Sequence, residues 1–204
     1  MASELKREIL GESLERMEKT TGNVKGDAIN LHVKYIKYKE GEESLEKVEK
    51  KMRELGCSLD FNKINRFDWY PVFLVDLIVI TSKEIFNWSN EDVFKMGMSA
   101  PRTSFVLRLF SKHISSVENL FKNASYIWER YFDSGKIEPV KIGDDFIIIR
   151  MKGYEVHPLI CQQYYCGYFL SLVKMCLPGK KVGIEETKCF FREDPYHEYL
   201  IKWE

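Results

Sequence analysis

Four side chains of the types that bind metal ions fall in the last quarter of the sequence. His157 and Cys161 are four residues apart in a segment expected to be helical, so they share one helix face. Cys189 and His197 come from two segments expected to pair as a hairpin, where they can approach each other. Two thiolates and two imidazoles suit tetrahedral zinc. The four residues are therefore the candidate metal ligands of the chain.

Ordinary core packing also explains these residues and stays open as the alternative. The spacing lacks the close Cys-x-x-Cys pair that makes a zinc site strong by sequence. Free cysteine is also among the residue types most often buried.

A second group of residues is aromatic and predicts an apolar ligand pocket. Sites for small molecules are mostly apolar with a few polar anchors, although such stripes also form ordinary core. Cys166 lies on a different helix face from Cys161 and is either a pocket thiol or a core residue. With Cys166, the candidate lining comprises Tyr164, Tyr165, Tyr168 and Phe169 on a long helix and Phe105, Phe110, Trp128 and Tyr131 from earlier helices.

Helices are expected to position the candidate residues that precede Gly135. Apolar residues recur at helical spacing through the N-terminal part of the chain, with capping patterns at serines. Pro71 is expected in the first turn of its helix, where its missing donor does no harm. The expected helices cover residues 3–19, 27–38, 42–55 and 70–86, and two more open at Ser89 with Asp92 and at Ser115 with Glu118.

The period changes from helical to strand-like after Gly135. Residues 137–142 and 146–151 are expected to form a hairpin, with 146–149 covered on both faces, followed by a helix over 157–177 and a second hairpin from 181–191 and 196–203. The chain is thus predicted to be one α+β domain over residues 1–204. Its mainly helical portion, 1–134, packs on a small, mostly antiparallel sheet in a strand-strand-helix-strand-strand portion, 135–204.

Composition restricts the partners and the compartment. The 204 residues carry 31 Lys and Arg against 31 Asp and Glu, so nucleic acid is not the expected partner. The N-terminus has no apolar signal run, which predicts a cytoplasmic protein whose five cysteines are reduced thiols or metal ligands and form no disulfides. Polar residues, among them Gln162 and Lys174, interrupt the most apolar stretch, 159–177, which predicts a buried helix and no membrane span.

Motifs for catalysis are missing from the sequence. It contains no Gly-x-Gly-x-x-Gly, Walker-type loop, Gly-x-Ser-x-Gly or His-Glu-x-x-His pattern. The carboxylate pairs 144–145 and 185–186 are interpreted as solvated, because neighbours on a strand point to opposite faces and the first pair falls in a turn. The sequence therefore favours a binding role over an enzymatic one.

The C-terminal motifs resemble a known family. Cys161-Gln-Gln-Tyr-Tyr-Cys-Gly-Tyr on a helix, Glu186-Thr-Lys-Cys on a strand and a final strand from Tyr196 are similar to the 4-vinyl-reductase-like small-molecule-binding domain over about the last 50 residues. Two features depart from that pattern, since Arg-Glu-Asp-Pro replaces a Gly-Asp turn and His197 stands at the last Cys position. By layout, the preceding helices resemble the wider superfamily that includes haem nitric-oxide-binding domains and TRAPP vesicle-tethering subunits.

The resemblance implies a sensor or binding domain for a hydrophobic small molecule in signalling or regulation. The alternatives are a TRAPP-like structural or tethering subunit and a haem-binding gas sensor. Haem is disfavoured because His32, on a charged helix, and His113, at an expected helix end, are interpreted as exposed histidines or helix-end cations. A homodimer or another protein partner is expected, because the early helices carry enough apolar faces for a twofold interface.

Overall fold

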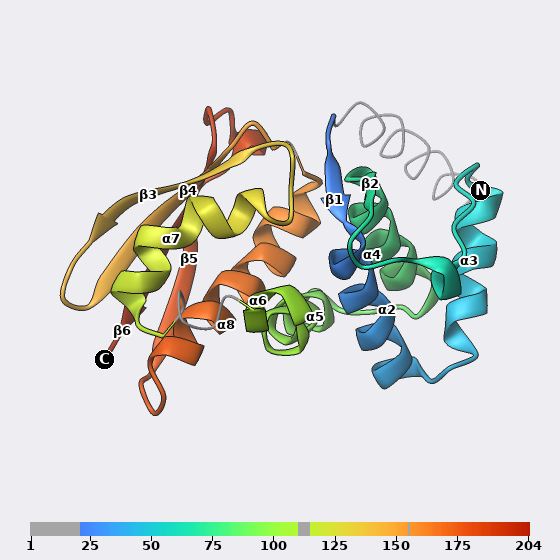
Figure 1. Cartoon of the computed structure of the whole chain (residues 1–204), viewed down its shortest axis with the longest axis horizontal. Helices are drawn as coiled ribbons and strands as arrows, with labels where there is room; N and C mark the ends of the chain where they lie inside the picture. The colour runs from blue at the N-terminus through green and yellow to red at the C-terminus, as the bar shows by residue number, and fades with distance from the viewer. Residues whose placement is uncertain (1–20, 110–114, 155) are drawn as a thin grey trace.

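The chain divides into a helical part and a sheet part that lie side by side (Figure 1). The computed structural model describes residues 21–109, 115–154 and 156–204, so the helix expected at 3–19 lies outside the described residues. The α+β fold class is confirmed. The helices of the first part are α2 (Gly26–Glu40), α3 (Ser44–Glu54), α4 (Phe73–Ile85), α5 (Asn90–Thr103) and α6 (Phe105–Leu109), with a 3-10 turn at Phe61–Lys63.

A two-stranded sheet precedes α4 and changes its expected start. β1 (Asn23–Lys25) pairs antiparallel with β2 (Trp69–Pro71), so that Asn23 lies opposite Pro71. The prediction of a helix from residue 70 with Pro71 in its first turn is therefore wrong, and α4 begins at Phe73. The strand pairing joins segments far apart in sequence, and helical periodicity carries no information on such a contact.

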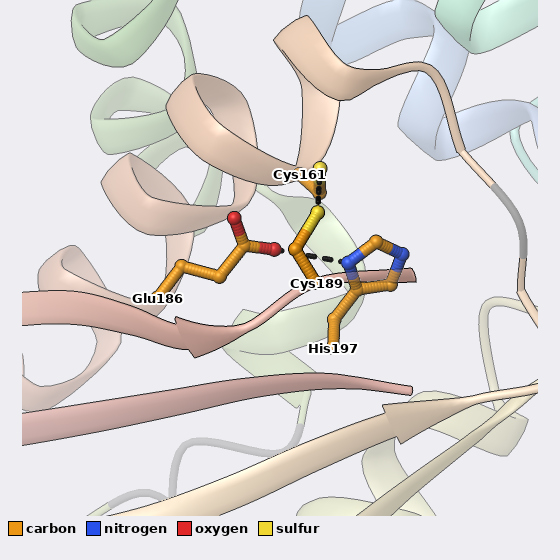
Figure 2. Close-up of side chains that lie close together, drawn as sticks. All are labelled: Cys161, Glu186, Cys189 and His197. Carbon is orange, nitrogen blue, oxygen red and sulfur yellow. Dashed lines mark hydrogen bonds and ion pairs between the residues drawn. The ribbon is translucent and has the colours of Figure 1, made fainter. Parts of the chain in front are cut away.

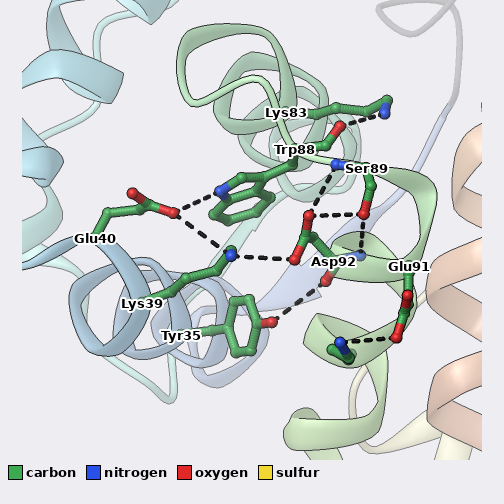
Figure 3. Close-up of polar contacts among 9 residues, drawn as sticks. Tyr35, Lys39, Glu40, Lys83, Trp88, Ser89, Glu91 and Asp92 are labelled. Atoms are coloured by element: carbon green, nitrogen blue, oxygen red, sulfur yellow. Dashed lines mark hydrogen bonds and ion pairs between the residues drawn. The ribbon is translucent and has the colours of Figure 1, made fainter.

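The start of α5 is held by the expected capping box (Figure 3). The Ser89 hydroxyl accepts from the Asp92 backbone N–H at 3.2 Å, and the Asp92 carboxylate accepts from the Ser89 N–H at 2.8 Å. Lys39 forms an ion pair with Asp92 at 3.1 Å, and Trp88 Nε1 donates to Glu40 at 2.8 Å. Hydrogen bonds from Ser89 lower the pKa of Asp92 to about 2. These contacts tie α2 to the first turn of α5.

The second part is a four-stranded antiparallel sheet in the order β3-β4-β6-β5. β4 buries Ile147 and Ile149 but leaves Phe146 and Ile148 half-buried, so the expectation that this strand is covered on both faces is wrong. Side chains along β4 alternate between a buried and a half-buried face, so one face of the sheet packs against the core, as is common in antiparallel sheets. The strands are β3 (Lys136–Ile142), β4 (Phe146–Lys152), β5 (Val182–Lys188) and β6 (His197–Trp203), with a 3-10 turn at Phe190–Arg192.

Helices α7 (Val117–Glu129) and α8 (Cys166–Cys176) cover the buried face of this sheet (Figure 1). The N-cap of α7 is Ser116, whose side chain accepts from the Asn119 N–H, one residue beyond the expected Ser115. Within the described ranges, no helix is long and apolar enough to cross a bilayer.

The long helix expected at 157–177 contains a π-helical turn, Ile160–Tyr165, directly before α8. Two glycines allow this helix to lie backbone to backbone against α5. A Cβ added to Gly97 would lie 2.0 Å from the Tyr164 carbonyl oxygen, and one added to Gly167 would lie 2.1 Å from that of Phe94. The close crossing fixes α8 between the helical part and the sheet.

A candidate metal centre beside two apolar cavities

The metal-ligand cluster comprises Cys161, Glu186, Cys189 and His197 (Figure 2). One ligand atom from each side chain lies within 4.8 Å of every other. The two sulfurs are 3.7 Å apart, and His197 Nδ1 lies 2.9 Å from Glu186 Oε1. Cysteine, histidine and glutamate side chains are all ligand types that zinc takes in proteins, and four of them suit its tetrahedral coordination.

The spacing of the sulfurs fits a zinc ion. Tetrahedral coordination with zinc–sulfur bonds of about 2.3 Å places two thiolates about 3.8 Å apart. Glu186 Oε2 and His197 Nε2 are buried and have no hydrogen-bond partner among the described residues. Buried polar atoms in native proteins are normally satisfied, so Glu186 Oε2 has coordination capacity that protein contacts leave unused. The His197 nitrogen that faces Glu186 is Nδ1, and Nε2 points away from the cluster (Figure 2).

Three segments bring the cluster together. Cys161 lies in the π-helical turn, and the Tyr199 hydroxyl donates to its carbonyl oxygen at 3.2 Å. Cys189 follows β5, and its backbone N–H donates to the Asp194 carboxylate at 2.9 Å in the connection to β6. Irregular π-helical turns often occur at functional sites. The cluster therefore joins the start of α8 to the β5–β6 hairpin.

The structure brings together three of the four residues selected from the sequence. His157 is not part of the cluster; it precedes the helix, where the Leu159 N–H donates to its Nδ1 at 3.2 Å. Glu186 takes the fourth place, and its interpretation as solvated is wrong because its side chain is only 5% exposed. Strand alternation was the available signal, since Glu186 shares the parity of Val182 and Ile184 on β5.

Burial controls the protonation of the thiols. It raises the pKa of Cys161 far above the ordinary value, with the Glu186 carboxylate and Cys189 adding to the effect, and it raises the pKa of Cys166 to about 12. The Cys161 thiol therefore keeps its proton without a metal. Zinc binding would replace that proton, because the thiolate is the ligand form.

An apolar cavity of about 50 Å³ lies between α7, α8 and the sheet, and we call it the sheet cavity. Four residues that the sequence selected for a ligand pocket line it: Trp128, Tyr131, Tyr168 and Phe169. Its other walls are Leu120, Phe121, Ala124, Ile127, Phe132, Ile137, Ile147, Ile149, Leu172, Val173 and Ile201.

A second cavity of about 30 Å³, the helix cavity, lies among α2, α4, α7 and the start of α8. Tyr164 and Tyr165 from the predicted set line it together with His32 and Asp76. The two cavities share four walls, which are Trp128, Tyr131, Phe132 and Tyr168. They are therefore neighbouring spaces on either side of one aromatic wall.

The remaining selected residues lie elsewhere. Phe105 is half-buried with its ring 6.1 Å from that of Phe67, and neither Phe105 nor Cys166 belongs to the walls of these two cavities. Phe110 and His113 lie outside the described residues. The interpretation of His32 as exposed is wrong, because it is 3% exposed.

Two ionisable side chains of the helix cavity are shifted toward their neutral forms. Burial lowers the pKa of His32 to about 3 and raises the pKa of Asp76 to about 8, against a hydrogen bond from the His157 backbone that lowers the latter. At neutral pH the cavity therefore holds an uncharged imidazole and a protonated carboxyl group.

The fold is that of H-NOX domains, although sequence comparison finds no relative: neither a family model nor a curated protein matches the chain. An H-NOX protein from S. oneidensis in the Fe(II)NO state has a TM-score of 0.61 at 14% identity, covering 88% of this chain and 99% of that one. An oxygen-binding H-NOX domain related to soluble guanylate cyclases has a TM-score of 0.58 at 14% identity, with 88% and 95% covered. An unliganded Fe(II) H-NOX mutant from K. algicida has a TM-score of 0.62 at 11% identity, with 88% and 96% covered.

Haem does not fit the described residues as they are arranged. An axial histidine must face an apolar space large enough for the porphyrin. Among the described residues, His32 is the histidine that lines one of these two cavities, but that space measures about 30 Å³ and the Tyr164 ring centroid lies 5.0 Å from the imidazole. Aromatic side chains thus occupy the interior around this histidine.

Proposed function

We propose that the chain is a sensor domain that binds a small apolar molecule at the sheet cavity and holds zinc at the metal-ligand cluster. The observation that carries this proposal is the double role of one helix. The α8 residues Tyr168, Phe169 and Leu172 line the cavity, while Cys161 in the preceding turn belongs to the cluster. A ligand that moves α8 also moves one zinc ligand against the hairpin that carries the others.

The size of the cavity supports a sensing role. A cavity of about 150 Å³ binds benzene in an engineered core, so a space of about 50 Å³ must enlarge to admit such a molecule. Binding therefore requires the walls to move, and the ligand selects the widened arrangement. That movement is the signal a sensor transmits.

The resemblances point in the same direction. The Cys161, Glu186 and Cys189 motifs resemble the 4-vinyl-reductase-like small-molecule-binding domain. The structural neighbours include proteins described as oxygen-binding and as ligated by nitric oxide, so this fold holds small ligands in other proteins. A four-ligand site without an open position gives zinc a structural role, which is to fix the hairpin to the helix.

The binding test uses ethylbenzene as the probe and protein-detected NMR as the readout. Ethylbenzene should shift resonances of α7, α8 and the sheet, and Ala124→Phe, which fills the cavity, should weaken binding by about tenfold or more. Lys122→Ala on the exposed face of α7 is the matched control and should leave the affinity unchanged. Absence of saturable binding, or equal affinity in both variants, would contradict the cavity assignment.

The metal test measures zinc by elemental analysis and native mass spectrometry on protein purified without chelator. One zinc per chain is expected, with stoichiometric loss in Cys189→Ser and retention in Cys176→Ser, whose thiol lies outside the cluster. Equal metal content in the two variants would refute the site.

We also propose that the signal passes to a second copy of the chain or to another protein. Sedimentation with and without ethylbenzene should show a change in the association state or in the capture of a partner. If the protein contains no bound small molecule and captures a partner equally with and without ethylbenzene, the result would instead support the TRAPP-like tethering role.

A further inference from the structure

His32 is one of several buried polar side chains without a hydrogen-bond partner in the described structure, and among them it is the one that lines a cavity with two unpaired nitrogens. Its side chain lies on α2 at 3% exposure, and both ring nitrogens are buried without a hydrogen-bond partner. The nearby polar groups pair among themselves, since Ser104 donates to Asp27 at 3.0 Å and also contacts the Tyr131 hydroxyl. The imidazole is thus unpaired, while Asp27, Ser104 and Tyr131 pair with one another.

The imidazole also borders a cavity of about 30 Å³. His32 lines the helix cavity, with Tyr164 against it in an edge-to-face contact at 5.0 Å. A neutral imidazole offers one donor and one acceptor, so a single hydroxyl or amide group could engage it. Apolar and aromatic side chains form most of the remaining wall, as in small-molecule sites with few polar anchors.

We infer that His32 is the polar anchor of the ligand site and selects uncharged molecules that carry one hydrogen-bonding group on an apolar body. This inference rests on the proposed function and names its ligand class. The aromatic wall of Trp128, Tyr131, Phe132 and Tyr168 lies between the two cavities, so a molecule anchored at His32 reaches the sheet cavity when these rings move apart. This is the wall movement that the proposed function already requires.

Charge supports the same ligand class. Burial lowers the pKa of His32 and raises that of Asp76, so both side chains are neutral near pH 7. An ionic ligand would have to leave water for a space without a compensating charge, which is strongly unfavourable. Neutral alcohols and amides meet no such barrier.

The test compares benzyl alcohol with its near-isostere ethylbenzene by NMR titration of the full chain. Benzyl alcohol should bind about tenfold more tightly or better, because a site built to pair a hydroxyl rejects the analogue that lacks one. His32→Phe keeps an aromatic ring but removes both nitrogens, and it should abolish or reverse this preference. His32→Gln, which restores a donor and an acceptor, should recover part of it.

The ratio of two affinities in the same protein is insensitive to a modest loss of stability, and circular dichroism checks that each variant folds. If both probes bind equally in wild type and His32→Phe, the anchor is refuted while the proposed function stands. If neither probe binds, the proposed function itself fails. A crystal structure with a fixed water on His32 in the presence of benzyl alcohol would also overturn the assignment.

Discussion

Asp76 gives a quantitative test of the interior electrostatics. The side chain is 4% exposed on α4, and burial raises its pKa from 3.8 to about 8. Between these two values the folded protein holds a proton that the unfolded chain releases. Folding stability from this group is therefore present at low pH and is lost as pH rises toward the folded pKa.

The magnitude follows from one proton. One proton corresponds to about 1.4 kcal/mol for each pH unit inside this window, so stability should fall by about 3 kcal/mol from pH 5 to pH 7.5 through Asp76 alone. Asp76→Asn keeps the shape of the side chain and cannot ionise. Relative to wild type, the Asn variant should therefore gain this amount of stability across the same interval.

The assay is urea unfolding of both proteins at half-unit steps of pH. The difference between the two free energies of unfolding isolates Asp76, because His32 and the other titrating groups are common to both proteins. In both proteins, His32 changes the stability with pH in the opposite sense to Asp76. Its pKa is lowered to about 3 in the folded protein, so the stability that it contributes is lost as pH falls below about 6.5. A wild-type to Asn difference that stays constant with pH would refute the buried, protonated carboxyl group.

Further substitutions test the packing and the cap. Gly97→Ala should destabilise the protein by about 1–3 kcal/mol in chemical denaturation, because its Cβ would lie 2.0 Å from the Tyr164 carbonyl oxygen, whereas Gly183→Ala meets nothing within 4 Å and should be neutral. Ser89→Ala should cost about 1 kcal/mol of thermal stability by removing the cap of α5, and no change would show that the box contributes nothing. Tyr199→Phe should cost about 1 kcal/mol and lower zinc retention under chelator challenge, because it removes the hydroxyl that holds the Cys161 carbonyl; unchanged retention would argue against this positioning.

Local signals in the sequence predicted much of the fold. The Ser89 capping box and the spacing of apolar residues on α2 and α3 depend on neighbours within a few positions, and the structure contains them. The start of α4 was misplaced because β2 is defined by pairing with β1, more than forty residues earlier.

The site was only partly predictable for a related reason. Cys161, Cys189 and His197 were recognisable as metal-ligand types, but choosing the fourth member required knowing which face of β5 turns inward. Glu186 was assigned to solvent together with Glu185 because adjacent residues on a strand point to opposite faces, yet the same alternation turns one of the two inward, and that one is Glu186. His32 was missed similarly, since the polar character of α2 as a whole concealed one buried position.

The coupling of ligand to the metal-ligand cluster is the central claim, and hydrogen exchange of the zinc-loaded protein tests it directly. Ethylbenzene should change backbone protection in the β5–β6 hairpin around Cys189 and His197, residues outside the sheet cavity walls. The change should disappear in Cys189→Ser while binding persists. Protection changes confined to the cavity walls, or identical in wild type and the variant, would contradict a sensor that signals through this cluster.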